Sequence, residues 1–181
     1  MSEAREIPGL EFGEWEEEKN DLVRLLPDGD YDLQFKSYEY NDEYGSVSFT
    51  FSVLNCSEAE WNGFQIFHRP YLTDYNNDQL PSKAYKATIL AICKDQIKEA
   101  TESGEKFRLL PSDVISGEAE PLRNAIGTVT NAHVEINKWE NADKGTSGEN
   151  NKVKKFNLKP LNPAVRYKFV ATIIPDRESI M

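Results

Sequence analysis

Hydrophobic and polar residues alternate along several short segments of the chain, which is the pattern of half-buried β-strands. The clearest alternation covers 46–53, where four large apolar residues fall on one face and small hydroxyl residues fall on the other. Similar alternation over 31–40, 64–71, 128–139 and 153–161 predicts four more strands. The residues expected to face the core are Tyr31, Leu33, Phe35, Val47, Phe49, Phe51, Val53, Phe64, Ile66, Ala132, Val134, Ile136, Phe156 and Leu158.

A helical spacing follows the third predicted strand, and Pro81 and Ser82 are typical of a helix start. The apolar residues of its buried stripe are Tyr85, Ile89, Ile92 and Cys93. Further along, Pro111 is placed to start a short helix and Gly127 to end another. Three strands, a helix and a two-stranded hairpin follow the element order of an oligonucleotide/oligosaccharide-binding (OB) barrel. We therefore expect a mainly β protein, a five-stranded OB-fold barrel with a helix between strands three and four, plus terminal extensions.

Composition divides the chain into three parts. Residues 1–25 are acid-rich and lack periodicity, which predicts a flexible arm. The OB-fold domain is expected over 26–161, with an insertion at 95–127 and a polar, mobile hairpin tip at 140–152. Residues 162–181 form a C-terminal extension with room for one extra strand.

The charge of the chain is unevenly distributed. Its formal net charge is −10, which by itself argues against a general nucleic-acid binder. Residues 121–181 nevertheless hold ten basic and six acidic residues, whereas residues 1–30 hold three basic and ten acidic ones. Because salt screens charges over about 8–10 Å, a phosphate chain responds to the local basic region more than to the total charge.

Segments 26–31, 87–93 and 151–156 read LPDGDY, ATILAIC and NKVKKF. In this order they resemble the LPxGxY opening, the helix and the NxVKxF closing strand of a phage protein family, and they span most of 26–161. That family, long filed as a domain of unknown function, is regarded as OB-fold single-stranded DNA-binding proteins found beside phage replication and recombination genes. The resemblance implies that this chain binds single-stranded DNA and has replication or recombination proteins as partners.

A single strand is bound by cations that contact its phosphates and by aromatic rings that stack on its bases, without strong sequence preference. Both kinds of side chain lie on the polar faces of the predicted strands and around the 140–152 hairpin. The candidate nucleic-acid-binding residues are Lys36, Tyr38, Tyr40, Phe67, Arg69, Tyr71, Lys138, Trp139, Lys144, Lys152, Lys154, Lys155 and Lys159. Five of these lysines surround the hairpin: Lys144, Lys152, Lys154, Lys155 and Lys159. If each neutralises one phosphate, the plot of log affinity against log salt concentration has a slope of about −3.5.

Other interpretations stay open at this stage. Aromatic residues of small β domains more often lie in the core than on a binding face, and a one-residue change of phase would bury Phe67. The lysines are also compatible with an ordinary solvated face. The alternative functions are an OB-fold protein-interaction module of the replication machinery, or an RNA binder, because stacking and phosphate contacts serve both nucleic acids.

The sequence offers no motif for catalysis or metal binding. It lacks a phosphate-binding glycine loop, a nucleophile elbow and paired His or Cys ligands, so we expect no enzyme activity, metal or cofactor. Cys56 and Cys93 are expected to stay reduced, and no apolar run approaches the about 20 residues of a membrane span. We expect a cytoplasmic monomer or homodimer, in the cytoplasm of the host cell if the chain is phage-encoded.

Overall fold

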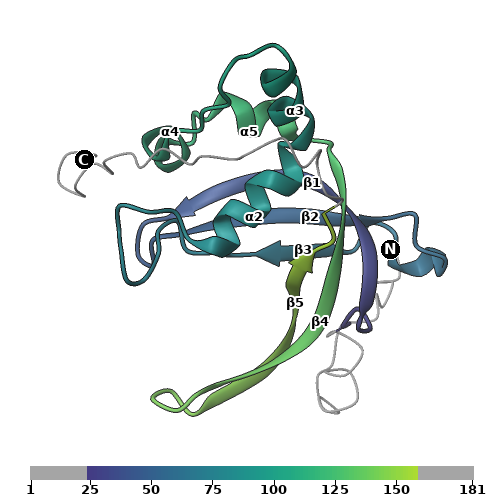
Figure 1. Ribbon diagram of the computed structural model, residues 1–181. Helices are drawn as coiled ribbons and strands as arrows, with labels where there is room; N and C mark the ends of the chain where they lie inside the picture. Colours follow the sequence, from purple (N-terminus) through teal and green to yellow (C-terminus); the bar gives the residue numbers. More distant parts are fainter. Residues whose placement is uncertain (1–23, 159–181) are drawn as a thin grey trace, which may run out of the picture.

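The computed structural model describes residues 24–158 (Figure 1). Most of the expected acidic arm, the C-terminal extension at 162–181 and Lys159 lie outside the described residues. The helices and strands are β1 (Gly29–Asn41), β2 (Ser46–Leu54), the short 3₁₀ helix η1 (Ala59–Trp61), β3 (Gln65–His68), α2 (Lys83–Ile92), α3 (Lys94–Glu102), α4 (Pro111–Ser116), α5 (Glu120–Ala125), β4 (Val129–Asn141) and β5 (Thr146–Phe156). Within 24–158, no helix has both the length and the apolar character that crossing a membrane requires.

The five strands form one antiparallel sheet in the order β3-β2-β1-β4-β5. The sheet curls so that its two outer strands, β3 and β5, come close together, but no ladder of the described residues joins them. Side chains bridge this gap instead, because the rings of His68 and Phe156 meet edge to face with 5.5 Å between their centroids. The fold is therefore mainly β, as expected, with a sheet that is not closed.

The alternation of β2 produces the centre of the core. Val47, Phe49, Phe51 and Val53 are completely buried, as predicted, because alternate side chains of a strand share one face. Helix α2 packs on this face, with the ring of Tyr85 6.3 Å from that of Phe49. The helix begins where the sequence predicts, since the Ser82 hydroxyl accepts a hydrogen bond from the Tyr85 amide, as N-cap residues do.

A β-bulge in β1 overturns the orientation predicted for Tyr38 and Tyr40. Phe35 pairs with Phe51, but the next pair is Ser37 with Thr50, so Lys36 is an extra residue. The extra residue changes the phase of the strand, as β-bulges do. Tyr38 and Tyr40 consequently point to the core side and pack against it, whereas Lys36 is exposed.

The insertion at 95–127 folds into α3, α4 and α5, and the last two cover the end of the sheet above β1 (Figure 1). Pro111 begins α4 as predicted, and Gly127, which has a φ of +97°, follows the end of α5. Val114 and Leu122 bury their side chains completely. The Tyr38 hydroxyl accepts a hydrogen bond of 2.9 Å from the Ala119 amide, which ties the insertion to the inner face of β1.

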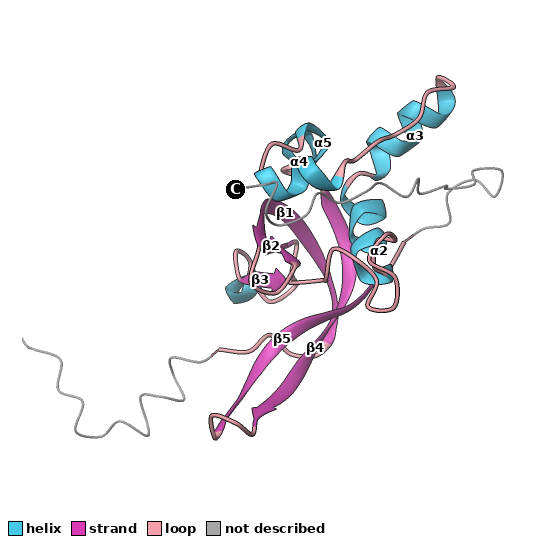
Figure 2. Ribbon diagram, turned by 90° about the vertical axis from the view of Figure 1, so that its left-hand side faces the viewer, coloured by secondary structure: helices cyan, strands magenta, loops and turns pink. Residues whose placement is uncertain are grey.

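The β4–β5 hairpin extends beyond the body of the protein (Figure 2). Strand pairing continues to Asn141 and Thr146, so the connecting turn is 142–145, shorter than the expected tip at 140–152. The prediction that Ile136 faces the core is wrong, because β4 has left the body at this point and Ile136 is 38% exposed. Leu158, also predicted to face the core, follows the end of β5 and is exposed.

The opening and closing segments that carry the family resemblance contact each other. The Asn151 side-chain amide accepts a hydrogen bond from the Leu26 amide (2.9 Å) and donates one to the Leu26 carbonyl (2.7 Å). The Asp28 carboxylate accepts a bond of 2.7 Å from the Ile136 amide, and the Tyr31 hydroxyl donates to the Pro27 carbonyl. These residues therefore fix the base of the hairpin against the start of β1, which is a structural role.

Candidate nucleic-acid interface

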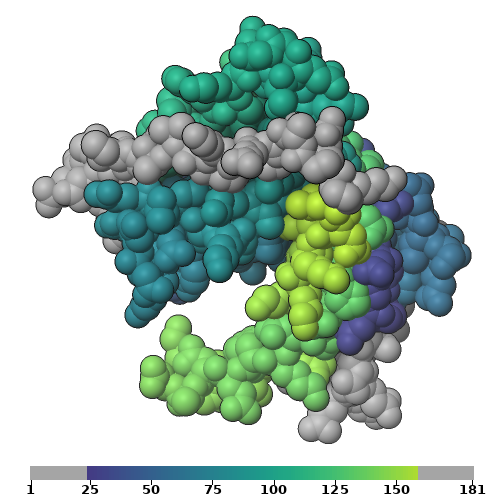
Figure 3. All heavy atoms as spheres, in the orientation of Figure 1, coloured from purple at the N-terminus to yellow at the C-terminus, as the bar shows by residue number. Residues whose placement is uncertain are grey.

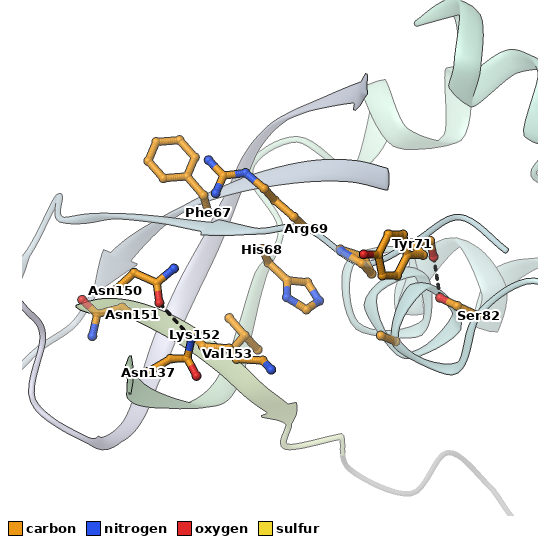
Figure 4. Close-up of a pocket in the computed structure, with 12 residues that line it drawn as sticks. Phe67, His68, Arg69, Tyr71, Ser82, Asn137, Asn150, Asn151, Lys152 and Val153 are labelled. Carbon is orange, nitrogen blue, oxygen red and sulfur yellow. Dashed lines mark hydrogen bonds between the residues drawn. The ribbon is translucent and has the colours of Figure 1, made fainter. Parts of the chain in front are cut away.

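A groove lies between β3, the residues that follow it, and the β4–β5 hairpin. It has a volume of about 390 Å³. Figure 3 shows the surface hollowed between the hairpin and the part of the chain near residues 70–85. One side of the groove is formed by Phe67, Arg69 and Tyr71, and the other by hairpin residues. In Figure 4 the His68 ring points toward the hairpin, whereas the Phe67 ring and the Arg69 guanidinium extend on the other side of β3. We call this feature the β3–hairpin groove.

The first wall follows from the alternation of β3. Ile66 is buried in the core, so Phe67 on the opposite phase is exposed by 46%. The outward orientation predicted for Phe67 is therefore correct. The guanidinium of Arg69 lies 5.3 Å from the centroid of the Phe67 ring, which places a cation and an aromatic face together. Tyr71, which is 63% exposed, extends this wall beyond the strand.

The second wall belongs to the hairpin. Asn137 and Asn150 face each other across β4 and β5, and the Asn137 Nδ2 donates a hydrogen bond of 3.3 Å to the Asn150 Oδ1. Lys152, two residues further along β5, is exposed and also lines the groove. The wall is thus polar and carries one positive charge.

His68 occupies the bottom of the β3–hairpin groove. Its Nε2 lies 3.0 Å from the Thr88 hydroxyl on α2, and its ring packs on Phe156. Burial, with a smaller effect of the nearby Lys152 charge, lowers the pKa of His68 from 6.5 to about 4. The imidazole is therefore neutral near pH 7.

The charges of the groove are of one sign. Its lining residues include Arg69 and Lys152 but no aspartate or glutamate. Among the residues that the structure describes, neither of these two cations forms a salt bridge, whereas Lys138 pairs with Glu149 and Lys154 pairs with Glu135. Lys152 lies opposite Glu135 in the β4–β5 register, but the ion pair of Glu135 is with Lys154. In a chain of net charge −10, two cations that form no salt bridge beside one groove favour the approach of an anion there.

Trp139 extends the hairpin wall toward its tip. It lies two residues beyond Asn137 and therefore on the same face of β4. Its ring covers Gly148 on β5, where a Cβ atom would lie only 2.6 Å from the Trp139 Cζ2. The absence of a side chain at Gly148 thus allows the indole to lie close to the β5 backbone while remaining 42% exposed.

The structure brings together only part of the predicted site. Phe67, Arg69, Tyr71 and Lys152 line the groove, and Trp139 lies on the same hairpin face as Asn137. Tyr38 and Tyr40 do not join them, because the bulge turns both toward the core. The remaining lysines are dispersed. Lys138 and Lys154 are in ion pairs. Lys36 is exposed at the bulge, Lys144 is exposed in the turn at the hairpin tip, and the exposed Lys155 lies opposite His133 in the β4–β5 ladder. Lys159 lies outside the described residues.

The sequence did not predict the other lining residues of the groove, and three of these, His68, Asn137 and Asn150, present polar side chains to which a ligand could bind. Asn137 could have been predicted, because it is two residues from Trp139 and therefore lies on the same outward face of β4. His68 and Asn150 gave no such signal, because their place depends on the approach of β3 to β5. Among the described residues, no three His, Cys, Asp or Glu side chains gather into a candidate metal site.

Comparisons with known proteins identify no relative from which a role can be transferred to these residues. No protein-family model, curated protein or solved structure matches the chain.

Proposed function

We propose that the protein binds single-stranded DNA in the β3–hairpin groove, with Arg69 and Lys152 contacting phosphates and exposed rings stacking on bases. The observation that carries this proposal is the pair of cations that form no salt bridge, Arg69 and Lys152, on opposite sides of a groove that Phe67 and Tyr71 also line. Stacking on an aromatic ring contributes about 1–3 kcal/mol per base and is tolerant of sequence. Such a groove favours a strand whose bases are free over a duplex whose ring faces are already stacked.

The proposed fold is an open OB-type barrel. The sheet order β3-β2-β1-β4-β5, the helix α2 between β3 and β4, and the approach of β3 to β5 all support it. In OB folds the strand 2–3 face and the loops joining strands 1–2 and 4–5 bind oligonucleotides. The β3–hairpin groove lies beside β3 and the β4–β5 hairpin, which is consistent with that use. A role beside phage replication and recombination proteins rests on the family resemblance and stays a prediction.

Fluorescence anisotropy with labelled oligothymidine, oligouridine and a duplex of equal length tests this proposal. We expect oligothymidine to bind better than the duplex, and log affinity to fall with log salt with a slope of about −1.4 for two neutralised phosphates. Arg69→Ala and Lys152→Ala should each weaken binding and reduce the magnitude of this slope by about 0.7. Lys154→Ala is the matched control, because Lys154 has the same charge on the same strand but is paired with Glu135.

Two results would contradict the proposal. Equal losses for Lys154→Ala and Lys152→Ala would show that the groove has no special role and that general charge attracts the strand. If oligothymidine does not bind at low salt, the proposal that the protein binds single-stranded DNA is wrong. Tighter binding of oligouridine than of oligothymidine would instead assign the groove to RNA, where 2′-hydroxyl contacts make the difference.

A further inference from the structure

The β3–hairpin groove contains neutral hydrogen-bonding groups in addition to its two cations. Asn137, Asn150 and His68 line the same cavity as Arg69 and Lys152. Cations bind phosphates through charge, whereas amides and a neutral imidazole match the donors and acceptors on the edges of bases. The groove thus holds two kinds of recognition group, and the neutral kind is not needed for stacking or phosphate contacts.

Each of the two asparagines keeps one end of its side-chain amide without a partner among the described residues. Their mutual bond uses the Asn137 Nδ2 and the Asn150 Oδ1. Within 24–158, the Asn137 Oδ1 acceptor and the Asn150 Nδ2 donor have no other partner. Asn151 is different, because both ends of its amide bind the Leu26 backbone and none remains for a ligand.

The hydrogen bonds of Thr88 fix which nitrogen of His68 is free. The Thr88 hydroxyl donates its proton to the Ala84 carbonyl at 2.7 Å, so it accepts a hydrogen bond from the His68 Nε2. The neutral ring then carries its proton on Nε2 and leaves Nδ1 as an acceptor. No fully buried side-chain nitrogen or oxygen of the described residues lacks a partner, so the unpartnered Nδ1 of His68, a residue that lines the groove, is not fully buried.

From this arrangement we infer that the cavity takes one unstacked nucleobase, whose edge forms hydrogen bonds with Asn137, Asn150 and His68. The cavity of about 390 Å³ lies at the lower end of the about 300–1,000 Å³ of ligand pockets, a size suited to one nucleoside. The exposed ring of Tyr71 lines the same cavity and offers a stacking face. The inference rests on the proposed function and adds to it one position at which the base itself is recognised.

Modified oligothymidines test the inference directly. A thymine methylated at N3 keeps its stacking face but loses its only N–H donor, which the His68 Nδ1 or the Asn137 Oδ1 would accept. In the shortest oligothymidine that binds with full affinity, one N3-methylthymine is moved through every position. We expect affinity to fall about tenfold at one position and to change little elsewhere, as loss of a good base contact costs about 1–3 kcal/mol.

Variants of the asparagines complete the test. Asn137→Ala and Asn150→Ala should bind unmodified oligothymidine more weakly and show a reduced penalty at the sensitive position. Asn124→Ala is the matched control, because Asn124 is an exposed asparagine on α5 outside the groove. Equal binding of oligonucleotides methylated at every position would overturn the base-recognition inference while leaving the proposed function in place. Failure of unmodified oligothymidine to bind would overturn the proposed function, and the inference with it.

Discussion

The ring of His68 on β3 meets the ring of Phe156 on β5 edge to face, with 5.5 Å between centroids and 79° between planes. This contact joins the two outer strands where no backbone ladder does so. Phe156 also lies 5.9 Å from Phe51 in the core, and His68 is hydrogen bonded to Thr88 on α2. The bottom of the proposed binding groove is therefore also the place where the curled sheet is held together.

The pH dependence of folding should report on this contact. Burial lowers the pKa of His68 from 6.5 to about 4, so the folded protein resists a proton that the unfolded chain accepts. The contribution to stability is full above pH 6.5 and is lost as the pH falls from 6.5 to about 4. The loss should reach about 3 kcal/mol in the free energy of unfolding, measured with urea at each pH.

His68→Phe provides the control for this measurement. It keeps an aromatic ring beside Phe156 but has no titrating group, so its stability should vary less than that of the wild type between pH 6.5 and 4. Because the other ionisable groups are the same in both proteins, the difference between the two curves isolates His68. Parallel curves would show that the His68 ring is not buried as the structure places it.

Two neighbouring asparagines on β5 should separate stability from binding. Asn151→Ala removes two hydrogen bonds to the Leu26 backbone and should lower the free energy of unfolding by about 2 kcal/mol. Hydrogen exchange should accelerate at the base of the hairpin. Asn150→Ala removes only an exposed bond to Asn137 and should change stability by less than about 0.5 kcal/mol. A reversal of this order would contradict the roles assigned to the two amides.

The elements with one buried face were predictable from sequence, whereas changes of phase were not. Val47 to Val53 of β2 alternate without interruption, and the strand is where the pattern places it. In β1 the apolar spacing changes from two, between Leu33 and Phe35, to three, between Phe35 and Tyr38. The change in spacing coincides with the bulge. A prediction from strict alternation ignores this change and therefore places Tyr38 on the outward face.

The groove itself could not be predicted from the sequence, because it forms between β3 and the β4–β5 hairpin, which are far apart in the chain. The exposure of Phe67 was predicted correctly, because alternation of side chains between the two faces is enough to orient residues within one strand. Ile136 shows where that rule fails: its phase is that of a core residue, but the body of the protein ends before it. Lys154 rather than its neighbour Lys152 forms the ion pair with Glu135, beside the bulge between His133 and Val134, which no local pattern indicates.

Tyr38→Phe should affect folding and leave DNA binding unchanged. The hydroxyl of Tyr38 accepts the hydrogen bond of the buried Ala119 amide, so its removal should lower the free energy of unfolding by about 1–2 kcal/mol. Urea unfolding and oligothymidine anisotropy on the same samples check both expectations. Weaker DNA binding with unchanged stability would instead support an outward, groove-facing Tyr38.

Gly148→Ala should weaken DNA binding through Trp139 without unfolding the hairpin. The new Cβ would lie 2.6 Å from the Trp139 Cζ2, so the indole must rotate away from the strand pair. Because the ring is already 42% exposed, this rotation should change the free energy of unfolding by less than about 1 kcal/mol. Tryptophan emission should shift to longer wavelength as the ring becomes more exposed.

If Trp139 stacks on a base, Gly148→Ala and Trp139→Ala should reduce oligothymidine affinity to a similar extent, about tenfold for one lost stacking contact. Ser147→Ala is the matched control, because Ser147 is the adjacent β5 residue and pairs with Glu140 rather than with Trp139. An unchanged affinity in Gly148→Ala, with a clear shift in emission, would show that the indole moves but does not touch the strand. The DNA-binding surface would then extend only as far as Asn137 and Asn150, and hairpin residues beyond them would not contact DNA.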